Sequence, residues 1–219
     1  MNKFISHRGN NSDTCENNLD CLKQVLNYDY ISGIEIDIRQ TKDLKLVLSH
    51  NSFVRKNFNF YFISKTNLKK LKQNTYIIKG REFKINTLKE LLSTINTNKI
   101  ILLDIKDNIN IHKFYNIIKK YQHLNIYICS FNYDLVLKVK KTYPHLKVGL
   151  IIGYKMNENK DITPFDFISV HYNSVDKYKK EHFVWTINNI NHLNNINDNL
   201  GIITDNSYIL NKKETNNSF

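Results

Sequence analysis

Short apolar runs alternate with helical patterns along almost the whole chain. The runs are rich in β-branched and aromatic residues and are mostly bounded by polar ones, which is typical of buried strands. Eight main strands are predicted, at Phe4–His7, Gly33–Ile38, Ile100–Ile105, Ile126–Cys129, Val148–Ile152, Phe167–Val170, Phe183–Ile187 and Gly201–Thr204. A further strand is expected at Leu46–Leu48, where the chain makes a hairpin-like excursion behind the second strand.

Helical spacing of apolar residues fills the segments between these strands. The clearest apolar faces are formed by Leu19, Leu22, Val25 and Leu26, by Leu88, Leu91, Leu92 and Ile95, and by Phe114, Ile117, Ile118 and Tyr121. Thr87 followed by Glu90 matches a capping box, so a helix is predicted to start there.

Strands that alternate with helices predict parallel strands joined by right-handed crossovers. Eight of them favour a single-domain α/β fold of the (β/α)8 TIM-barrel type, and 219 residues lie near the lower end for that fold. A doubly wound open sheet is the alternative, and periodicity alone does not separate the two. With no internal repeat and no linker, we expect one barrel domain over residues 1–210 and a flexible polar tail over residues 211–219.

The formal net charge of +12 is compatible with nucleic acid, an anionic membrane surface or a phosphate-bearing substrate as partner. The chain is also rich in Asn, Lys, Ile and Tyr and has only six Gly and two Pro, as an AT-rich genome would produce. Its lysines occur as scattered doublets. We therefore interpret the charge mainly as compositional drift and expect no specific nucleic-acid partner.

The three cysteines are Cys15, Cys21 and Cys129. An odd number without a CxxC pair argues against a disulfide framework and against structural zinc, so reduced thiols are expected. No segment resembles a signal peptide or approaches the ~20 apolar residues of a membrane span. These features predict a cytoplasmic protein.

Carboxylates lie at the carboxyl ends of two predicted strands, the edge that carries active sites in barrels. Glu35 and Asp37 are one residue apart, so both side chains should face the barrel interior, and Asp104 would add a third oxygen beside them. Lys106 would point inward next to Asp104. Buried carboxylates repel one another unless a cation offsets them, and Mg²⁺ or Ca²⁺ is the natural partner for oxygen ligands. A polar barrel layer held by internal salt bridges is the alternative interpretation.

His7, Arg8 and His50 complete a constellation at the same predicted edge. Histidine both accepts and donates a proton near neutral pH, so one imidazole would activate an attacking oxygen while the other protonates the leaving oxygen. Arg8 and Lys106 would bring positive charge to a phosphoryl group. A metal, two imidazoles and two cations match the requirements of phosphodiester displacement.

A series of motifs in this order resembles the glycerophosphodiester phosphodiesterase family. The motifs are His7-Arg8-Gly9, Glu16-Asn17, Gly33-Ile34-Glu35-Ile36-Asp37, Thr41-Lys42-Asp43, Ser49-His50, Thr87-Leu88-Lys89-Glu90, Asp104-Ile105-Lys106, Ser130-Phe131, Trp185-Thr186-Ile187-Asn188 and Gly201-Ile202-Ile203-Thr204-Asp205. Each motif is weak alone, but together they span nearly the whole chain.

This resemblance implies a TIM barrel that uses a divalent metal ion, Mg²⁺ or Ca²⁺, to hydrolyse glycerophosphodiesters to glycerol 3-phosphate and an alcohol. The roles it implies are an acid/base pair (His7 and His50), metal ligands (Glu35, Asp37 and Asp104), phosphate contacts (Arg8 and Lys106) and a pocket wall (Trp185). The sequence departs from the family where Asp104 replaces the usual Glu, and this shortens the carboxylate by one methylene.

Two other functions are compatible with parts of the pattern. A phospholipase D of the sphingomyelinase D type shares the first histidine and the Glu-x-Asp layout, but Asp104-Ile105-Lys106 and Thr204-Asp205 favour the hydrolase family. A catalytically decayed barrel that binds nucleic acid or membrane is the second, and the intact polar residues argue against decay. The expected partners are a small glycerophosphodiester or lysophospholipid substrate and, transiently, an anionic membrane.

Overall fold

The computed structural model describes residues 2–9, 16–78, 81–154, 160–177, 180–194 and 200–206. Eight parallel strands form its centre: β1 (Lys3–His7), β2 (Gly33–Gln40), β8 (Ile100–Ile105), β9 (Asn125–Ser130), β10 (Lys147–Ile152), β11 (Phe167–His171), β12 (His182–Trp185) and β13 (Gly201–Thr204). Strand β1 pairs with β13 on one side and with β2 on the other, so the sheet closes on itself. The predicted barrel is confirmed, and the open sheet is excluded.

The predicted strands agree with the observed ones to within a few residues at their ends. The excursion is β3 (Leu46–Leu48), which pairs antiparallel with β2. Strand β12 ends at Trp185, two residues before the predicted end at Ile187. The chain leaves the ladder there and carries the Asn188 side chain to the backbone N–H of Asp205, beyond the end of β13.

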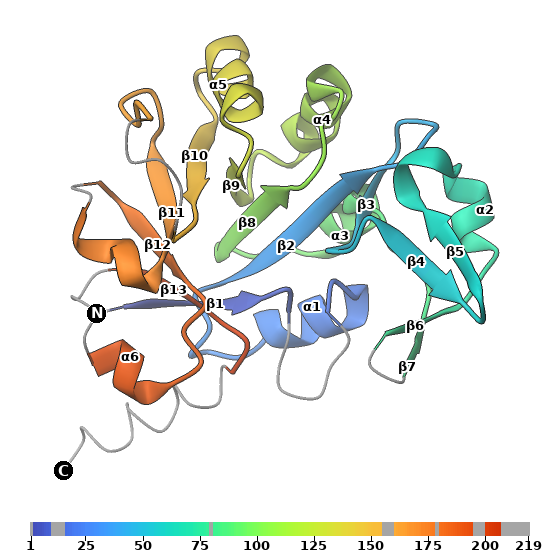
Figure 1. The fold of residues 1–219 in the computed structure, drawn as a ribbon, viewed down its shortest axis with the longest axis horizontal. Helices are drawn as coiled ribbons and strands as arrows, with labels where there is room; N and C mark the ends of the chain where they lie inside the picture. The colour runs from blue at the N-terminus through green and yellow to red at the C-terminus, as the bar shows by residue number, and fades with distance from the viewer. Residues whose placement is uncertain are drawn as a thin grey trace.

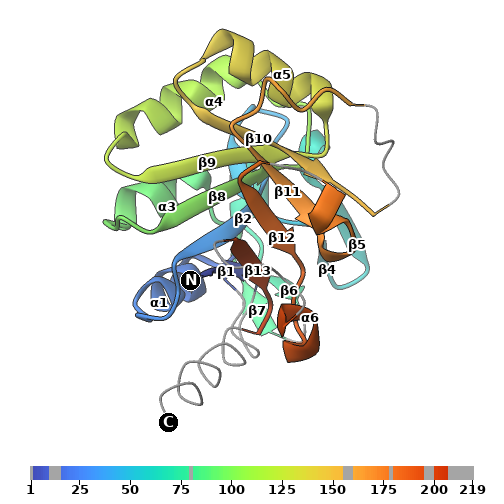
Figure 2. The ribbon, with the colours of Figure 1, turned by 90° about the vertical axis from the view of Figure 1, so that its left-hand side faces the viewer.

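Helices cover the outside of the strands (Figures 1 and 2). They are α1 (Leu19–Leu26), α3 (Leu88–Thr94), α4 (Ile111–Ile118), α5 (Tyr133–Thr142) and α6 (Ile190–Asn194). A further helix, α2 (Leu68–Lys72), lies beside the barrel, and 3-10 turns occur at Ile63–Lys65, Lys119–Tyr121 and Tyr172–Lys177. The predicted capping box at the start of α3 is present in full, since the Thr87 side chain accepts from Glu90 N–H and the Glu90 carboxylate accepts from Thr87 N–H. The apolar faces of α1, α3 and α4 pack on the barrel.

Aromatic rings fill the barrel interior toward the amino-terminal ends of the strands. Tyr127, Phe167 and Phe183 pack edge to face with centroids 5.2 to 5.5 Å apart. Room for two of these rings comes from glycine, because a Cβ on Gly149 would lie 2.4 Å from the Phe167 ring and one on Gly201 would lie 2.3 Å from the Phe183 ring. This layer closes the barrel from below and makes a floor for the polar residues above it.

The segment between β3 and α3 forms a small unit beside the barrel. It contains the hairpins β4–β5 (Phe53–Lys56 and Asn59–Phe62) and β6–β7 (Tyr76–Ile78 and Arg81–Phe83), with α2 between them. Its own apolar cluster includes Val54, Ile63 and Tyr76. Within the described residues, no helix is long and apolar enough to cross a membrane.

Candidate active site

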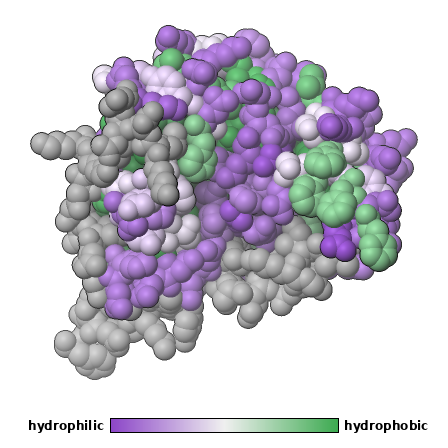
Figure 3. All heavy atoms as spheres, in the orientation of Figure 1, coloured by the Kyte–Doolittle hydropathy of each residue, from purple (hydrophilic) through white to green (hydrophobic). Residues whose placement is uncertain are grey.

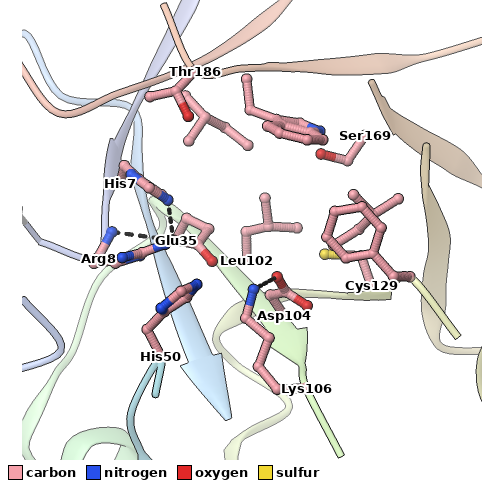
Figure 4. Close-up of a pocket in the computed structure, with 14 residues that line it drawn as sticks. His7, Arg8, Glu35, His50, Leu102, Asp104, Lys106, Cys129, Ser169 and Thr186 are labelled. Atoms are coloured by element: carbon pink, nitrogen blue, oxygen red, sulfur yellow. Dashed lines mark hydrogen bonds and ion pairs between the residues drawn. The ribbon is translucent and has the colours of Figure 1, made fainter. Parts of the chain in front are cut away.

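The inward-pointing positions change from apolar to polar toward the carboxyl ends of the strands. On β1 the sequence runs from Ile5 to His7, and on β8 it runs from Leu102 to Asp104, in steps of two residues. A pocket of about 220 Å³ opens above the floor at this edge, and His7, Glu35, His50 and Asp104 are among the residues that line it (Figure 4). The structure therefore brings the predicted polar residues to one place.

Three carboxylates meet on the paired strands β2 and β8. Glu35 and Asp37 come from β2, and Asp104 lies opposite Asp37 in the strand register. One oxygen from each carboxylate lies within 4.8 Å of the others, and the three residues are 5%, 0% and 4% exposed. The spacing of two residues thus turns Glu35 and Asp37 inward together, as predicted.

Two cations sit against the carboxylates. Lys106 Nζ lies 2.9 Å from Asp37 Oδ1 and also contacts Asp104, while Arg8 Nε lies 3.1 Å from Asp37 Oδ2. Burial favours the neutral form of Asp37, but Lys106 and Arg8 outweigh it and hold the pKa of this carboxyl below its usual range. Burial likewise opposes the charge on Lys106, but Asp104 and Asp37 raise the pKa of the ammonium.

The remaining two carboxyls are incompletely neutralised. Burial, with the Asp37 charge beside it, raises the pKa of Glu35 to about 8. Burial also raises the pKa of Asp104 to about 6, against the pull of Lys106. Among the described residues, Asp104 Oδ1 is buried and accepts no hydrogen bond. An oxygen-rich, electron-rich cluster with an unpaired buried oxygen fits a divalent cation.

His7 is held in one tautomer by a residue that sequence reasoning gave no role. Its Nδ1 lies 2.6 Å from Asp205 Oδ1, and an ionised carboxylate only accepts, so Nδ1 carries the proton and Nε2 faces the pocket near Glu35. Burial lowers the pKa of His7, but the hydrogen bond to Asp205 and the Glu35 charge outweigh burial and leave the pKa raised. Asn188 fixes Asp205 in turn by donating to Oδ2 at 2.7 Å.

His50 follows β3 and lines the pocket on the side of Glu35 that faces away from His7 (Figure 4). Burial lowers the pKa of its imidazole, and the neighbouring Arg8 and Lys106 add to that effect against Asp37. Its backbone is fixed by Arg39, whose Nε and Nη2 donate to the His50 carbonyl at 2.9 and 2.8 Å. The sequence gave no signal for Arg39 beyond its place on β2.

Glu16 and Asn17 were part of the motif pattern without an assigned role. Asn17 Nδ2 donates to Asp37 Oδ2 at 2.8 Å, and Asn17 Oδ1 accepts from the Asp37 backbone N–H at 3.0 Å. Glu16 accepts from Arg8 Nη1 at 3.0 Å. These two side chains therefore position a carboxylate and a guanidinium of the site.

The opposite wall of the pocket is aromatic. Trp185 and Phe131 line it with ring centroids 5.8 Å apart, in an edge-to-face arrangement. Lys106 Nζ lies 5.9 Å from the centre of the Phe131 ring. Cys129 is buried and free beneath this wall, and Cys21 is also free, whereas Cys15 lies outside the described residues.

A parallel barrel whose strand ends carry buried carboxylates, paired histidines and cations defines a class of barrel enzymes that act on phosphodiesters. The family model for the glycerophosphoryl diester phosphodiesterase family matches residues 7–208. The chain belongs to this family.

Relatives agree with this membership. A glycerophosphodiester phosphodiesterase of Caldanaerobacter subterraneus subsp. tengcongensis is 32% identical over 67% of this chain, and the match spans 65% of the relative's own length. The glycerophosphodiester phosphodiesterase structure from Thermotoga maritima is 25% identical, with a TM-score of 0.76 over 97% of this chain and 98% of that one. An Oleispira antarctica phosphodiesterase, solved with its product sn-glycerol-3-phosphate, is 21% identical, with a TM-score of 0.79 over 99% and 97% of the chains.

Proposed function

We propose that this protein hydrolyses small glycerophosphodiesters to glycerol 3-phosphate and an alcohol in a metal-dependent reaction. The observation that carries the proposal is the pocket in which His7 and His50 flank a buried cluster of Glu35, Asp37 and Asp104. Family membership supports the phosphodiester as substrate, and the product held by the Oleispira antarctica relative supports the glycerol phosphate moiety.

Glu35, Asp37 and Asp104 would hold a divalent ion, and when bound this ion would supply positive charge that polarises the phosphoryl oxygens. Arg8 and Lys106 would bind the phosphate, since both cations line the pocket beside Asp37. Trp185 and Phe131 would pack against the glycerol or alcohol portion and exclude water from that side.

The positions of the two histidines on either side of Glu35 (Figure 4) and the opposite directions of their pKa shifts support separate roles for them in the reaction. His50, whose pKa is lowered, is neutral near pH 7 and accepts a proton from the attacking water as the water oxygen forms its bond to phosphorus. His7, whose pKa is raised by Asp205, is protonated and delivers its Nε2 proton to the departing alcohol oxygen as the P–O bond breaks. Asp205 and Asn188 are positioning residues for His7.

Leaving-group dependence tests the roles separately. His7→Ala and His50→Ala should each lower turnover of glycerophosphocholine by about 10²–10⁴-fold. An aryl ester of glycerol 3-phosphate needs no proton on its leaving group, so His7→Ala should regain most of its activity on that ester while His50→Ala does not. Equal losses of both variants on both substrates would refute the assignment.

Product analysis and chelation test the reaction itself. Release of free glycerol 3-phosphate that stops with EDTA and returns with Mg²⁺ or Ca²⁺ is the expected result. A cyclic phosphate as the end product would favour the sphingomyelinase D type of chemistry, and turnover that EDTA leaves unchanged would remove the metal from the proposal.

A further inference from the structure

The positive charge of the chain is concentrated in one segment. Residues 44–81 contain nine Lys or Arg and no Asp or Glu, whereas the whole chain carries 32 Lys and Arg against 20 Asp and Glu. Nine of the twelve net positive charges therefore come from these 38 residues. Compositional drift would spread the charge over the chain, so it does not account for this segment.

Hairpin β4–β5 lies inside this basic segment and has two different faces. In its register, Phe53 pairs with Phe62 and Arg55 pairs with Phe60, so these four side chains share one face. The other face carries Val54, which packs inward on the apolar cluster of the unit. The face with the phenylalanines is therefore the outer face of the hairpin. It is aromatic, although a strand face that contacts water is ordinarily polar.

The outer face exposes large rings to solvent. Phe58, at the turn, is 89% exposed, and Phe60 and Phe62 are 54% and 48% exposed. Figure 3 shows this apolar patch over β4 and β5, beside a polar region. Contiguous exposed apolar patches of this kind mark interaction sites on soluble domains.

Cations are interleaved with the rings. The Arg55 guanidinium lies 5.8 Å from the centre of the Phe60 ring, and Lys65 Nζ lies 5.6 Å from the centre of the Phe62 ring. Both cationic residues are exposed. We propose that this aromatic-basic face, formed by Arg55, Phe58, Phe60, Phe62 and Lys65, docks the protein on an anionic membrane surface.

The chemistry of the face fits a lipid headgroup region. The rings would insert at the boundary of headgroups and acyl chains, while Arg55 and Lys65 contact lipid phosphates. Each cation near an anionic surface strengthens binding by roughly fivefold, and exposed charges of this kind are screened by salt. The absence of carboxylates from residues 44–81 removes the repulsion that an acidic side chain would add.

The ring geometry favours a membrane over nucleic acid. Phe53 meets Phe60 and Phe62 edge to face, at interplanar angles of 69° and 60°, so these rings do not form a flat platform on which bases could stack. A lipid interface accepts rings in any orientation. The hairpin also begins three residues after His50, and Phe53 and His50 line one groove, so docking would bring the membrane next to the pocket.

Vesicle sedimentation of the full chain tests the proposal without any catalytic readout, so its outcome is independent of the proposed hydrolysis. The wild type should bind phosphatidylcholine–phosphatidylglycerol vesicles, should bind pure phosphatidylcholine vesicles at least tenfold more weakly, and should lose binding at high salt. The triple variant F58S/F60S/F62S and the double variant Arg55→Gln/Lys65→Gln should each weaken binding by about tenfold or more.

The matched control is Lys138→Gln/Lys141→Gln, which removes two exposed cations from α5 and should keep wild-type binding. All variants should retain their melting temperature and their turnover of soluble glycerophosphocholine, because the substituted side chains are exposed and outside the pocket. Failure of the wild type to bind anionic vesicles would overturn the proposal. So would an equal loss in the control, or undiminished binding by the triple variant.

Two further measurements identify a different occupant. Binding to poly(U), lost in the triple variant while no vesicles are bound, would assign the face to nucleic acid. A wild-type dimer in light scattering that becomes monomeric in the triple variant, again without vesicle binding, would assign it to a second copy of the chain.

Discussion

Asp205→Asn isolates the effect of holding His7 in one protonation state. In the wild type, Asp205 Oδ1 accepts from His7 Nδ1 and Oδ2 accepts from Asn188 Nδ2. If the asparagine oxygen stays on Asn188, its NH₂ group faces His7. Two donors then meet, so Nδ1 must give up its proton and the imidazolium is no longer stabilised.

The size of the effect follows from what His7 would contribute as an acid. General acid catalysis is worth about 10²–10⁴-fold, so Asp205→Asn should lower turnover of glycerophosphocholine by roughly 10²-fold or more, with His7→Ala as the limit. This is about 2.7 kcal/mol or more of transition-state stabilisation. Asp205→Ala should cost less, because it removes the partner without presenting a competing donor.

The pH profile separates this mechanism from a loss of structure. Activity that needs protonated His7 falls as pH rises through its pKa, and this pKa is raised mainly by Asp205 against the effect of burial. The alkaline limb of kcat/KM should therefore move to lower pH in Asp205→Asn, while activity on the aryl ester stays near that of the wild type. An unmoved alkaline limb, or turnover within a few fold of wild type, would refute the reasoning.

Three further outcomes are expected from the buried polar site and the barrel floor. At a concentration of Mg²⁺ or Ca²⁺ 100-fold above its Kd, the ion should raise the free energy of unfolding by about 2.7 kcal/mol. Asp104→Glu should bind the ion more tightly in isothermal titration. If neither the wild type nor Asp104→Glu gives a heat of binding, both expectations are wrong. The metal-free protein should lose on the order of 4 kcal/mol of stability as pH rises from 4.5 to about 8, because folded Glu35 holds a proton that the unfolded chain releases. Urea unfolding should show a clearly larger decline in the wild type than in Glu35→Gln, where Asp104, whose pKa burial raises to about 6, still contributes. Gly149→Ala should lower the free energy of unfolding by about 1–3 kcal/mol, since the new Cβ would lie 2.4 Å from the Phe167 ring. An unchanged midpoint of urea unfolding would show instead that the aromatic layer rearranges without cost.

Local patterns were sufficient to predict the barrel strands and the inward-pointing carboxylates at their ends. The period of two along a strand turned Glu35 and Asp37 to one side, and the parallel register then placed Asp104 beside Asp37. The Thr87–Glu90 capping box depends only on residues three apart, and it formed as predicted. The strand alternation and the capping box follow from short-range geometry, so the sequence alone contains them, whereas the place of Asp104 beside Asp37 followed from the predicted parallel pairing of their strands.

Contacts between distant residues were not predictable in this way. Asp205 lies 198 positions from His7, and its role depends on the closure of the barrel through β1 and β13. The clue was present, because Asp205 is two residues beyond the inward-facing Ile203, but only the closed barrel shows which side chain it meets. The contact of Arg39 with the carbonyl of His50 likewise depends on the path of the excursion after β3.

The β4–β5 hairpin escaped prediction for a different reason. Its second strand, Asn59–Phe62, carries rings on both faces, so it lacks the alternation of apolar and polar residues that identifies a half-buried strand. The pattern was obscured by Phe60 and Phe62 on the outer face. Apolar side chains on an exposed strand face are expected where that face binds a partner. The membrane proposal depends on the same exposed rings.

The site itself also departs from what stability alone would select. Three carboxylates inside a barrel repel one another and lose hydration, and the structure offsets this cost with Arg8, Lys106 and the amide of Asn17. The offset is incomplete, because burial and neighbouring charge keep the pKa of Glu35 at about 8 and Asp104 Oδ1 has no hydrogen bond among the described residues. A fold that needed only internal salt bridges would gain from pairing that oxygen. A divalent ion would be attracted by this remaining negative charge, and Arg8 and Lys106, which partly offset it, would contact the phosphate of the proposed substrate.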